Sequence, residues 1–196
     1  MDNNLNNSRE LILNKIRNGK PQHVALPDVP LYAYKGNLIE GFRTHLTEFD
    51  GKFQEFGNRS EAIKWLQSEL DPGKKIFSNI PDFQGTIATD SFKDPHLAHV
   101  VDICVTEGVL GVAETESVWV NDEVLGVSAA ALFSTDLYLL LDRSKLVDGL
   151  HAAYKSLNLR HHQYGAFYTG PSATADIEAV HITGAQGEIS LTVLLY

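Results

Sequence analysis

The sequence predicts an α/β domain with a mostly parallel sheet, flanking helices and an N-terminal helical lead-in. Strand-like apolar runs alternate with amphipathic helical stretches, which is the pattern of a layered α/β fold. The run 137–141 is continuously apolar, as expected for a strand of a sheet that is covered on both faces. We expect a single domain over residues 1–196, of which about 1–50 is the lead-in.

The first third of the chain is predicted to be mainly helical. Asn7 and Glu10 form a capping-box pattern ahead of the first helix, and Asn58 and Glu61 form another ahead of the third. Three prolines break the pattern between the first two helices. The expected elements are helix 8–18, extended loop 21–36, helix 38–49, strand 52–56 and a helix from Asn58 to about Leu70.

The rest of the chain is predicted to be rich in strands. A helix is expected to open at Ser144, because an apolar stripe runs from Leu146 to Leu157 at helical spacing. The strands within 101–120 follow one another so closely that we expect a hairpin or antiparallel insert there. The strand candidates are 75–78, 86–89, 101–105, 109–113, 117–120, 137–141, 166–169 and 190–195.

Composition excludes several classes of protein. The formal net charge of −9 argues against electrostatic binding of nucleic acid or anionic lipid over a broad surface. Cys104 is the single cysteine, so the chain can form no internal disulfide and cannot build an iron–sulfur cluster alone. We expect Cys104 to be a buried, inert thiol. The sequence shows no secretory signal and no apolar run of about 20 residues, so a cytoplasmic location is expected.

Three polar segments could carry chemistry. In the first, Glu114 and Glu116 would point to one face if the chain is extended, and two close carboxylates can raise one pKa to create a general acid or base. The alternative is an exposed strand end. In the second, a strand runs through Gly170 into an expected short helix capped by Ser172 or Thr174, with Asp176 and Glu178 in its first turn.

The third segment, Gly184 to Glu188, has paired glycines that predict a tight turn before the last strand. Other motifs are weaker. His96 and His99 have a spacing that a metal site permits, but a third placed ligand is lacking and we predict no metal. The pair His161-His162 follows a helix and is expected to face solvent. No phosphate-binding loop or nucleophile elbow is present.

Taken together, the three segments resemble the lactate-utilisation (LUD) domain family, in particular its LutC/YkgG group. That family carries Ala-Glu-Thr-Gly-Thr after a strand, then Gly-Pro-Ser-Arg-Thr-Ala-Asp-Ile-Glu, then Gly-x-His-Gly-Pro before a closing strand. The corresponding segments here are Ala113-Glu-Thr-Glu-Ser117, Gly170-Pro-Ser-Ala-Thr-Ala-Asp-Ile-Glu178 and Gly184-Ala-Gln-Gly-Glu188, in the same order. The resemblance is clearest over residues 100–196.

The resemblance implies a fold similar to ribose-phosphate isomerases, glucosamine-phosphate deaminases and CoA transferases. It also implies a non-redox accessory role in oxidising L-lactate to pyruvate, with iron–sulfur clusters only in partner proteins and none in this chain. A free-standing enzyme with isomerase-like or CoA-transferase-like carboxylate chemistry, or a regulatory module that binds a small anionic metabolite, is the alternative. Glu114 and Asp176 are the candidate catalytic pair. The candidate ligand-binding residues are Thr115, Gly170, Ser172, Thr174, Glu178, Gly184 and Gly187.

Three positions depart from the family pattern. Ala173 stands where the family has Arg, which removes a cation that could hold a carboxylate. Glu116 replaces Gly and adds negative charge, and Gln186 replaces His and removes a group that titrates near neutral pH. All three changes make an anion a less favourable ligand, so we expect a divergent member of the family.

Overall fold

The computed structural model describes residues 3–21, 24–25, 27–28, 30, 35–92, 94–175, 178 and 180–196. It forms two compact units, Met1–Pro30 and Leu31–Tyr196. The first unit contains helix α1 (Asn3–Asn18), which starts five residues before the predicted helix. Helix α2 (Leu38–Glu48) belongs to the second unit, where it contacts the first strand of the main sheet, so the unit boundary falls earlier than position 50.

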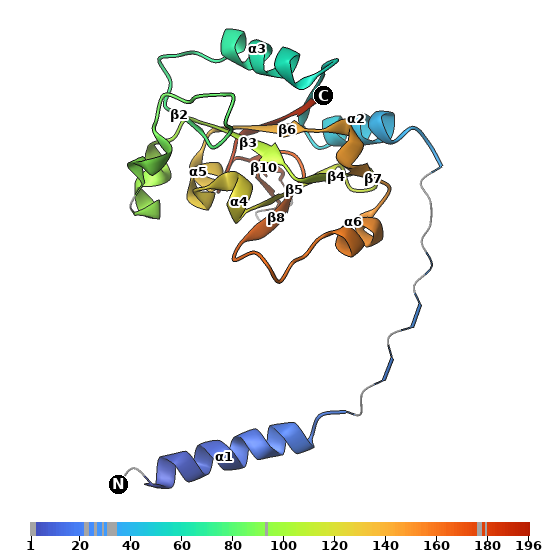
Figure 1. Ribbon diagram of the computed structural model, residues 1–196, viewed down its shortest axis with the longest axis vertical. Helices are drawn as coiled ribbons and strands as arrows, with labels where there is room; N and C mark the ends of the chain where they lie inside the picture. The colour runs from blue at the N-terminus through green and yellow to red at the C-terminus, as the bar shows by residue number, and fades with distance from the viewer. Residues whose placement is uncertain are drawn as a thin grey trace. The chain divides into compact units, whose positions relative to one another are not determined.

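A five-stranded parallel sheet forms the centre of the second unit (Figure 1). Its strand order is β1-β11-β6-β3-β2, and every neighbouring pair is parallel. All amino ends therefore lie along one edge of the sheet and all carboxyl ends along the other. The strands are β1 (Lys52–Glu55), β2 (Ile76–Ser78), β3 (Ile103–Gly108), β6 (Asp136–Leu141) and β11 (Ser190–Leu195).

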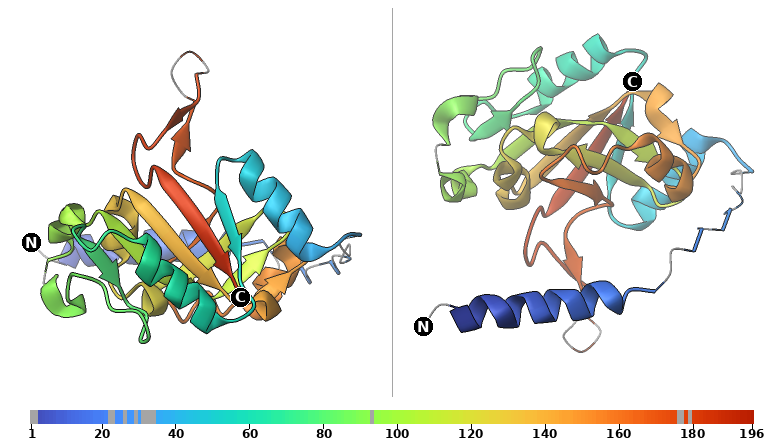
Figure 2. Two further views of the ribbon diagram at one scale, coloured as in Figure 1. Left: turned by 90° about the horizontal axis from the view of Figure 1, so that it is seen from above. Right: turned by 60° about the horizontal axis from the view of Figure 1, so that its bottom comes forward.

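A second sheet of four strands, in the order β7-β4-β5-β8, packs against one face of the first. Strands β4 and β5 form an antiparallel pair, so the hairpin predicted within 101–120 is confirmed. Between β8 and β11 the chain forms a small hairpin that projects from the unit (Figure 2). The strands are β4 (Leu110–Val112), β5 (Ser117–Asn121), β7 (Leu146–Val147), β8 (Gly165–Tyr168), β9 (Ala173–Thr174) and β10 (Ile182–Thr183).

Apolar side chains cover the central sheet on both faces, which explains the continuous apolar run of β6. Helix α3 (Arg59–Glu69) packs on one face, where Leu66 joins Leu140 and Leu194. Helix α2 and the second sheet pack on the other face around Leu139 and Val193. Three short helices complete the unit: α4 (Asp122–Leu125), α5 (Ser128–Phe133) and α6 (Leu150–Ser156). Figure 1 shows α3 and the second sheet on opposite sides of the central sheet.

Three predicted elements differ in the structure. The segment 86–89 forms only an isolated bridge at Ile87, because the Thr86 hydroxyl binds Ile76 N and Lys74 O in place of a strand ladder. The helix expected from Ser144 begins only at Leu150, since Leu146 and Val147 pair with β4. The chain also forms three 3₁₀ turns: Thr89–Ser91 and Pro95–Val100 precede β3, and Arg143–Lys145 precedes β7. The sequence reading missed α4 and α5.

The third difference concerns the helix expected after Ser172. Residues 173–174 instead pair with 182–183 in the β9–β10 hairpin. The Ser172 hydroxyl donates to Gln186 O, so it makes a bond of the hairpin rather than capping a helix. The pairing of Thr174 with Ile182 joins two β-branched residues, which favour strands.

Candidate functional site

The second and third predicted segments lie together, just before the amino end of β11. Ser172 N donates to Glu188 O at 2.9 Å, and Gly184 N donates to Ser172 O at 2.7 Å. Gly187 has φ +135°, and a side chain there would lie 2.9 Å from Ser172 Cβ. Ser172, Gly184 and Gly187 are therefore neighbours in the structure. Their bonds hold the base of the hairpin, and a ligand-binding role for them stays a prediction.

The other predicted site residues of the second segment do not take part in these hydrogen bonds at the base of the hairpin. Gly170 has φ +74°, and a Cβ there would lie 2.7 Å from Phe49 O after helix α2. Glu178 is exposed in a left-handed conformation, with φ +54°. Thr174 is half-buried in β9, and Asp176 lies outside the described residues. The proposed catalytic pair of Glu114 with Asp176 therefore stays a prediction.

Glu114 and Glu116 do not share a face, because residues 113–116 form a turn rather than an extended strand. The exposed Glu114 carboxylate accepts a hydrogen bond from Leu150 N at 3.0 Å, at the start of α6. Glu116 turns inward with φ +44° and is only 6% exposed. Thr115 bonds Ser117 through their hydroxyls, at 2.6 Å. The first segment thus places one carboxylate on the surface and the other inside.

Two carboxyl groups are buried near the amino edge of the central sheet. Burial raises the pKa of Glu116; the nearby Glu48 adds to the rise, and His45, 4.0 Å away, opposes it. Burial also raises the pKa of Glu188, which is 5% exposed and has no ion pair among the described residues. The first segment thus contains a carboxyl with raised pKa, Glu116, but the main cause is burial and not repulsion between paired carboxylates.

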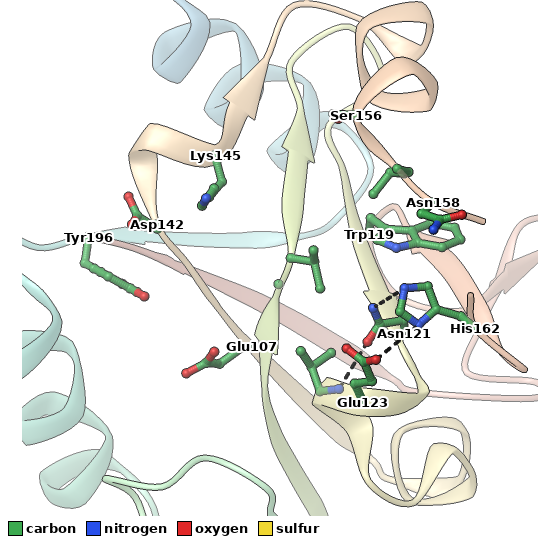
Figure 3. Close-up of a pocket in the computed structure, with 14 residues that line it drawn as sticks. Glu107, Trp119, Asn121, Glu123, Asp142, Lys145, Ser156, Asn158, His162 and Tyr196 are labelled. Atoms are coloured by element: carbon green, nitrogen blue, oxygen red, sulfur yellow. Dashed lines mark hydrogen bonds and ion pairs between the residues drawn. The ribbon is translucent and has the colours of Figure 1, made fainter. Parts of the chain in front are cut away.

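A cavity of about 470 Å³ lies at the opposite, carboxyl edge of the sheet (Figure 3). Glu107 and Gly108 end β3, Asp142 follows β6, and Tyr196 follows β11. Ligands of open α/β sheets bind outside the carboxyl ends of the strands, so this is the edge where a site is expected. The volume falls within the range of small-molecule sites, about 300–1,000 Å³. None of the predicted site residues that the structure describes lines this cavity.

One wall of the cavity is a polar network around His162. Asn121 Oδ1 accepts a hydrogen bond from Val124 N at 3.1 Å, which fixes the orientation of the Asn121 amide. The amide NH₂ therefore faces His162 Nε2 at 3.2 Å and donates to it. The proton of a neutral His162 then belongs on Nδ1, which lies 3.2 Å from Asp122 Oδ1. The ring orientation and tautomer are thus set by the protein.

The contact between Asp122 and His162 is electrostatic, because its angle is poorer than that of a hydrogen bond. Burial acts to raise the pKa of Asp122, but a hydrogen bond from Gln163 N and the nearby His162 outweigh it, so the pKa lies below its usual value. The side chain of His162 is only 14% exposed, so the prediction that the 161–162 pair faces solvent is wrong for this residue. His161 is exposed as expected.

The opposite side of the cavity carries Lys145 (Figure 3). Asp142 accepts a hydrogen bond from Ser144 N, which lowers its pKa, and the charge of Lys145 adds to the effect. Glu107 is paired with Arg59, which also binds Asp82 and the Tyr196 hydroxyl. A signal for this site existed in the sequence, since Glu107 and Asp142 stand at the carboxyl ends of predicted strands. The sequence alone did not reveal the site because its lining residues come from distant parts of the chain.

The structure also bears on the other reactive residues. Cys104 is 1% exposed, and burial raises the pKa of its thiol to about 12, which confirms the prediction of a buried thiol. His96 and His99 lie in a 3₁₀ turn, where His96 pairs with Asp94 at 2.8 Å. Among the described residues, no three His, Cys, Asp or Glu side chains gather as metal ligands would. No helix in the described ranges is long and apolar enough to cross a membrane.

The fold and the cavity define an α/β domain with a candidate ligand site at the carboxyl edge of a parallel sheet. The family model of the LUD domain matches residues 6–196, so the chain belongs to the LUD domain family. The fold is similar to the crystal structure of a DUF162 family protein from Deinococcus radiodurans, with a TM-score of 0.65 and 11% identity over 81% of this chain and 95% of that one. Comparison with curated proteins finds no match.

Proposed function

We propose that this chain is a LutC/YkgG-like, non-redox accessory subunit of a system that oxidises L-lactate to pyruvate. The observation that carries the proposal is the LUD domain match over residues 6–196. A partner would supply the iron–sulfur clusters, since four thiolates are normally needed and Cys104 is the single, buried cysteine of this chain. The proposal includes a cytoplasmic location, because a free thiol fits a reducing compartment.

The proposal is tested by capturing the tagged, full-length chain from native cells grown on L-lactate. We expect the eluate to contain an iron–sulfur protein, detected by mass spectrometry together with iron and acid-labile sulfide. The same capture from cells grown without lactate controls for non-specific binding. An eluate from lactate-grown cells that holds no iron–sulfur or lactate-linked protein would contradict the proposal.

A free-standing enzyme with carboxylate chemistry is the second candidate. The observation that favours it is the pair of buried carboxyls, Glu116 and Glu188, whose pKa values are raised by burial. A carboxyl with a raised pKa holds its proton to higher pH and can act as a general acid. Thermal-shift measurements with lactate, pyruvate, sugar phosphates and CoA separate the candidates, because a bound ligand stabilises the folded chain. Stabilisation by CoA or a sugar phosphate alone would favour the enzyme.

A further inference from the structure

The carboxyl-edge cavity is lined by a lysine, Lys145, whose charge is felt by Asp142 but which forms no close ion pair in the described part of the chain. Glu107 is engaged by Arg59, and Asp142 bonds the backbone of its own turn. Lys145 forms no ion pair with any residue the structure describes, although it lines the cavity. An ammonium group in this position is available to pair with an anionic group of a ligand.

The other side of the cavity offers groups suited to hydroxyls. Asn158 and Glu123 are exposed there and present an amide and a carboxylate. Trp119 forms part of the same wall and gives it an apolar surface.

The spacing of these groups limits the size of the ligand. Figure 3 shows Lys145 on one side of the cavity and the Asn121–His162 pair on the other. A three-carbon acid such as lactate has six non-hydrogen atoms and would leave most of a cavity of about 470 Å³ empty. The volume of the cavity therefore leaves room for an acid longer than lactate.

We propose that this cavity binds a hydroxylated carboxylic acid longer than lactate, of the sugar-acid class, with its carboxylate at Lys145 and its hydroxyls at Asn158 and Glu123. The chain of carbons then lies along Trp119. This site goes beyond the proposed role in lactate oxidation and does not depend on it, because it rests on the cavity alone.

The two tryptophans of the chain allow a local test. Trp65 packs against Phe56 and Tyr138, outside the cavity, so Trp65→Phe leaves Trp119 as the single tryptophan reporter. D-gluconate is titrated into this variant and the emission of Trp119 is recorded. Sorbitol provides the hydroxyls without the charge, acetate the charge without the hydroxyls, and L-lactate the shorter acid. We expect a saturable change with D-gluconate alone.

Lys145→Gln in the same background is expected to weaken D-gluconate binding by about tenfold or more, since a hydrogen bond to a charged group is lost. Lys64→Gln, on the exposed side of α3, is the matched control and should leave the affinity unchanged. Melting temperatures of the chain with both tryptophans provide a second readout, with an expected rise of a few degrees, on the order of 3–6 °C, at ten times the Kd.

Three results would overturn the proposal. The first is the absence of a saturable D-gluconate response in both the emission and the melting measurements. The second is equal affinity in the Lys145→Gln and Lys64→Gln variants, which would place the ligand elsewhere. The third is an L-lactate, acetate or sorbitol response as strong as that of D-gluconate. None of these results bears on the capture of an iron–sulfur partner, so failure here is distinguishable from failure of the proposed function.

Discussion

At the scale of single residues, Glu116 explains a departure from the family pattern. Its φ of +44° lies in the left-handed region that favours glycine, the residue the family carries at this position. The backbone has kept the glycine conformation although the side chain has changed. Glu116 thereby combines backbone strain with a buried carboxyl.

Replacing Glu116 with Gly should stabilise the protein. Left-handed strain of about 1–2 kcal/mol is relieved, while the added freedom of the unfolded chain costs about 0.5–1 kcal/mol. Loss of the buried carboxyl adds to the gain, so we expect a net rise of about 1 kcal/mol in the free energy of unfolding, measured by urea denaturation. Glu178→Gly, at φ +54° but exposed, is the control and should gain less. A loss of stability in Glu116→Gly would refute this account.

Glu188 should make stability depend on pH. Its pKa is raised above the ordinary 4.5, so the folded chain holds the proton more tightly than the unfolded chain does. The stability that the tighter proton binding contributes is fully present below the ordinary pKa and is lost as pH rises toward the raised pKa. Glu188→Gln should therefore gain stability relative to wild type as pH rises above about 4.5.

Urea denaturation at several pH values measures this effect, with Glu69→Gln, exposed at the end of α3, as control. For the control, the difference in the free energy of unfolding from wild type should be nearly constant with pH. If this difference is also constant for Glu188→Gln, the buried carboxyl of Glu188 is not the source of the pH dependence.

At the scale of elements, the capping signal at Asn58 predicted the start of α3, whereas the one at Asn7 was wrong, because α1 begins at Asn3 and Asn7 lies within it. Asn58 Oδ1 accepts from Glu61 N at 3.1 Å, and Glu61 reaches back to Gly57 N at 3.0 Å, one residue before the cap. The segment after Ser172 carried a similar signal and became a hairpin. Pairing with residues 182–184 is a contact between distant positions, and the spacing of polar residues near Ser172 could not reveal it.

Asn58→Ala should cost about 1 kcal/mol of stability, because it removes the cap of α3. Chemical denaturation compared with wild type measures the loss. Ser60→Ala, an exposed substitution in the first turn of the same helix, should change stability by less than about 0.5 kcal/mol. Equal losses in the two variants would contradict the capping role.

At the scale of the whole second unit, the sequence predicted a mostly parallel sheet, but it did not predict the strand order or which residues meet at each edge of the sheet. Strand order β1-β11-β6-β3-β2 brings the last strand between β1 and β6, which periodicity alone does not predict. Ser172, Gly187 and Glu188 consequently lie at the amino edge of the sheet. Residues far apart in the chain, such as Glu107, Lys145 and His162, meet at the carboxyl edge. Those three became visible as one site only through the topology.

The central claim is that this member of the LUD domain family takes part in the oxidation of L-lactate. It is tested most directly by growth on L-lactate of native cells from which the chain has been deleted, with growth on another carbon source as the control. We predict that the deletion slows or abolishes growth on L-lactate alone and that the wild-type chain restores it. Growth of the deleted cells on L-lactate at the wild-type rate would contradict the claim.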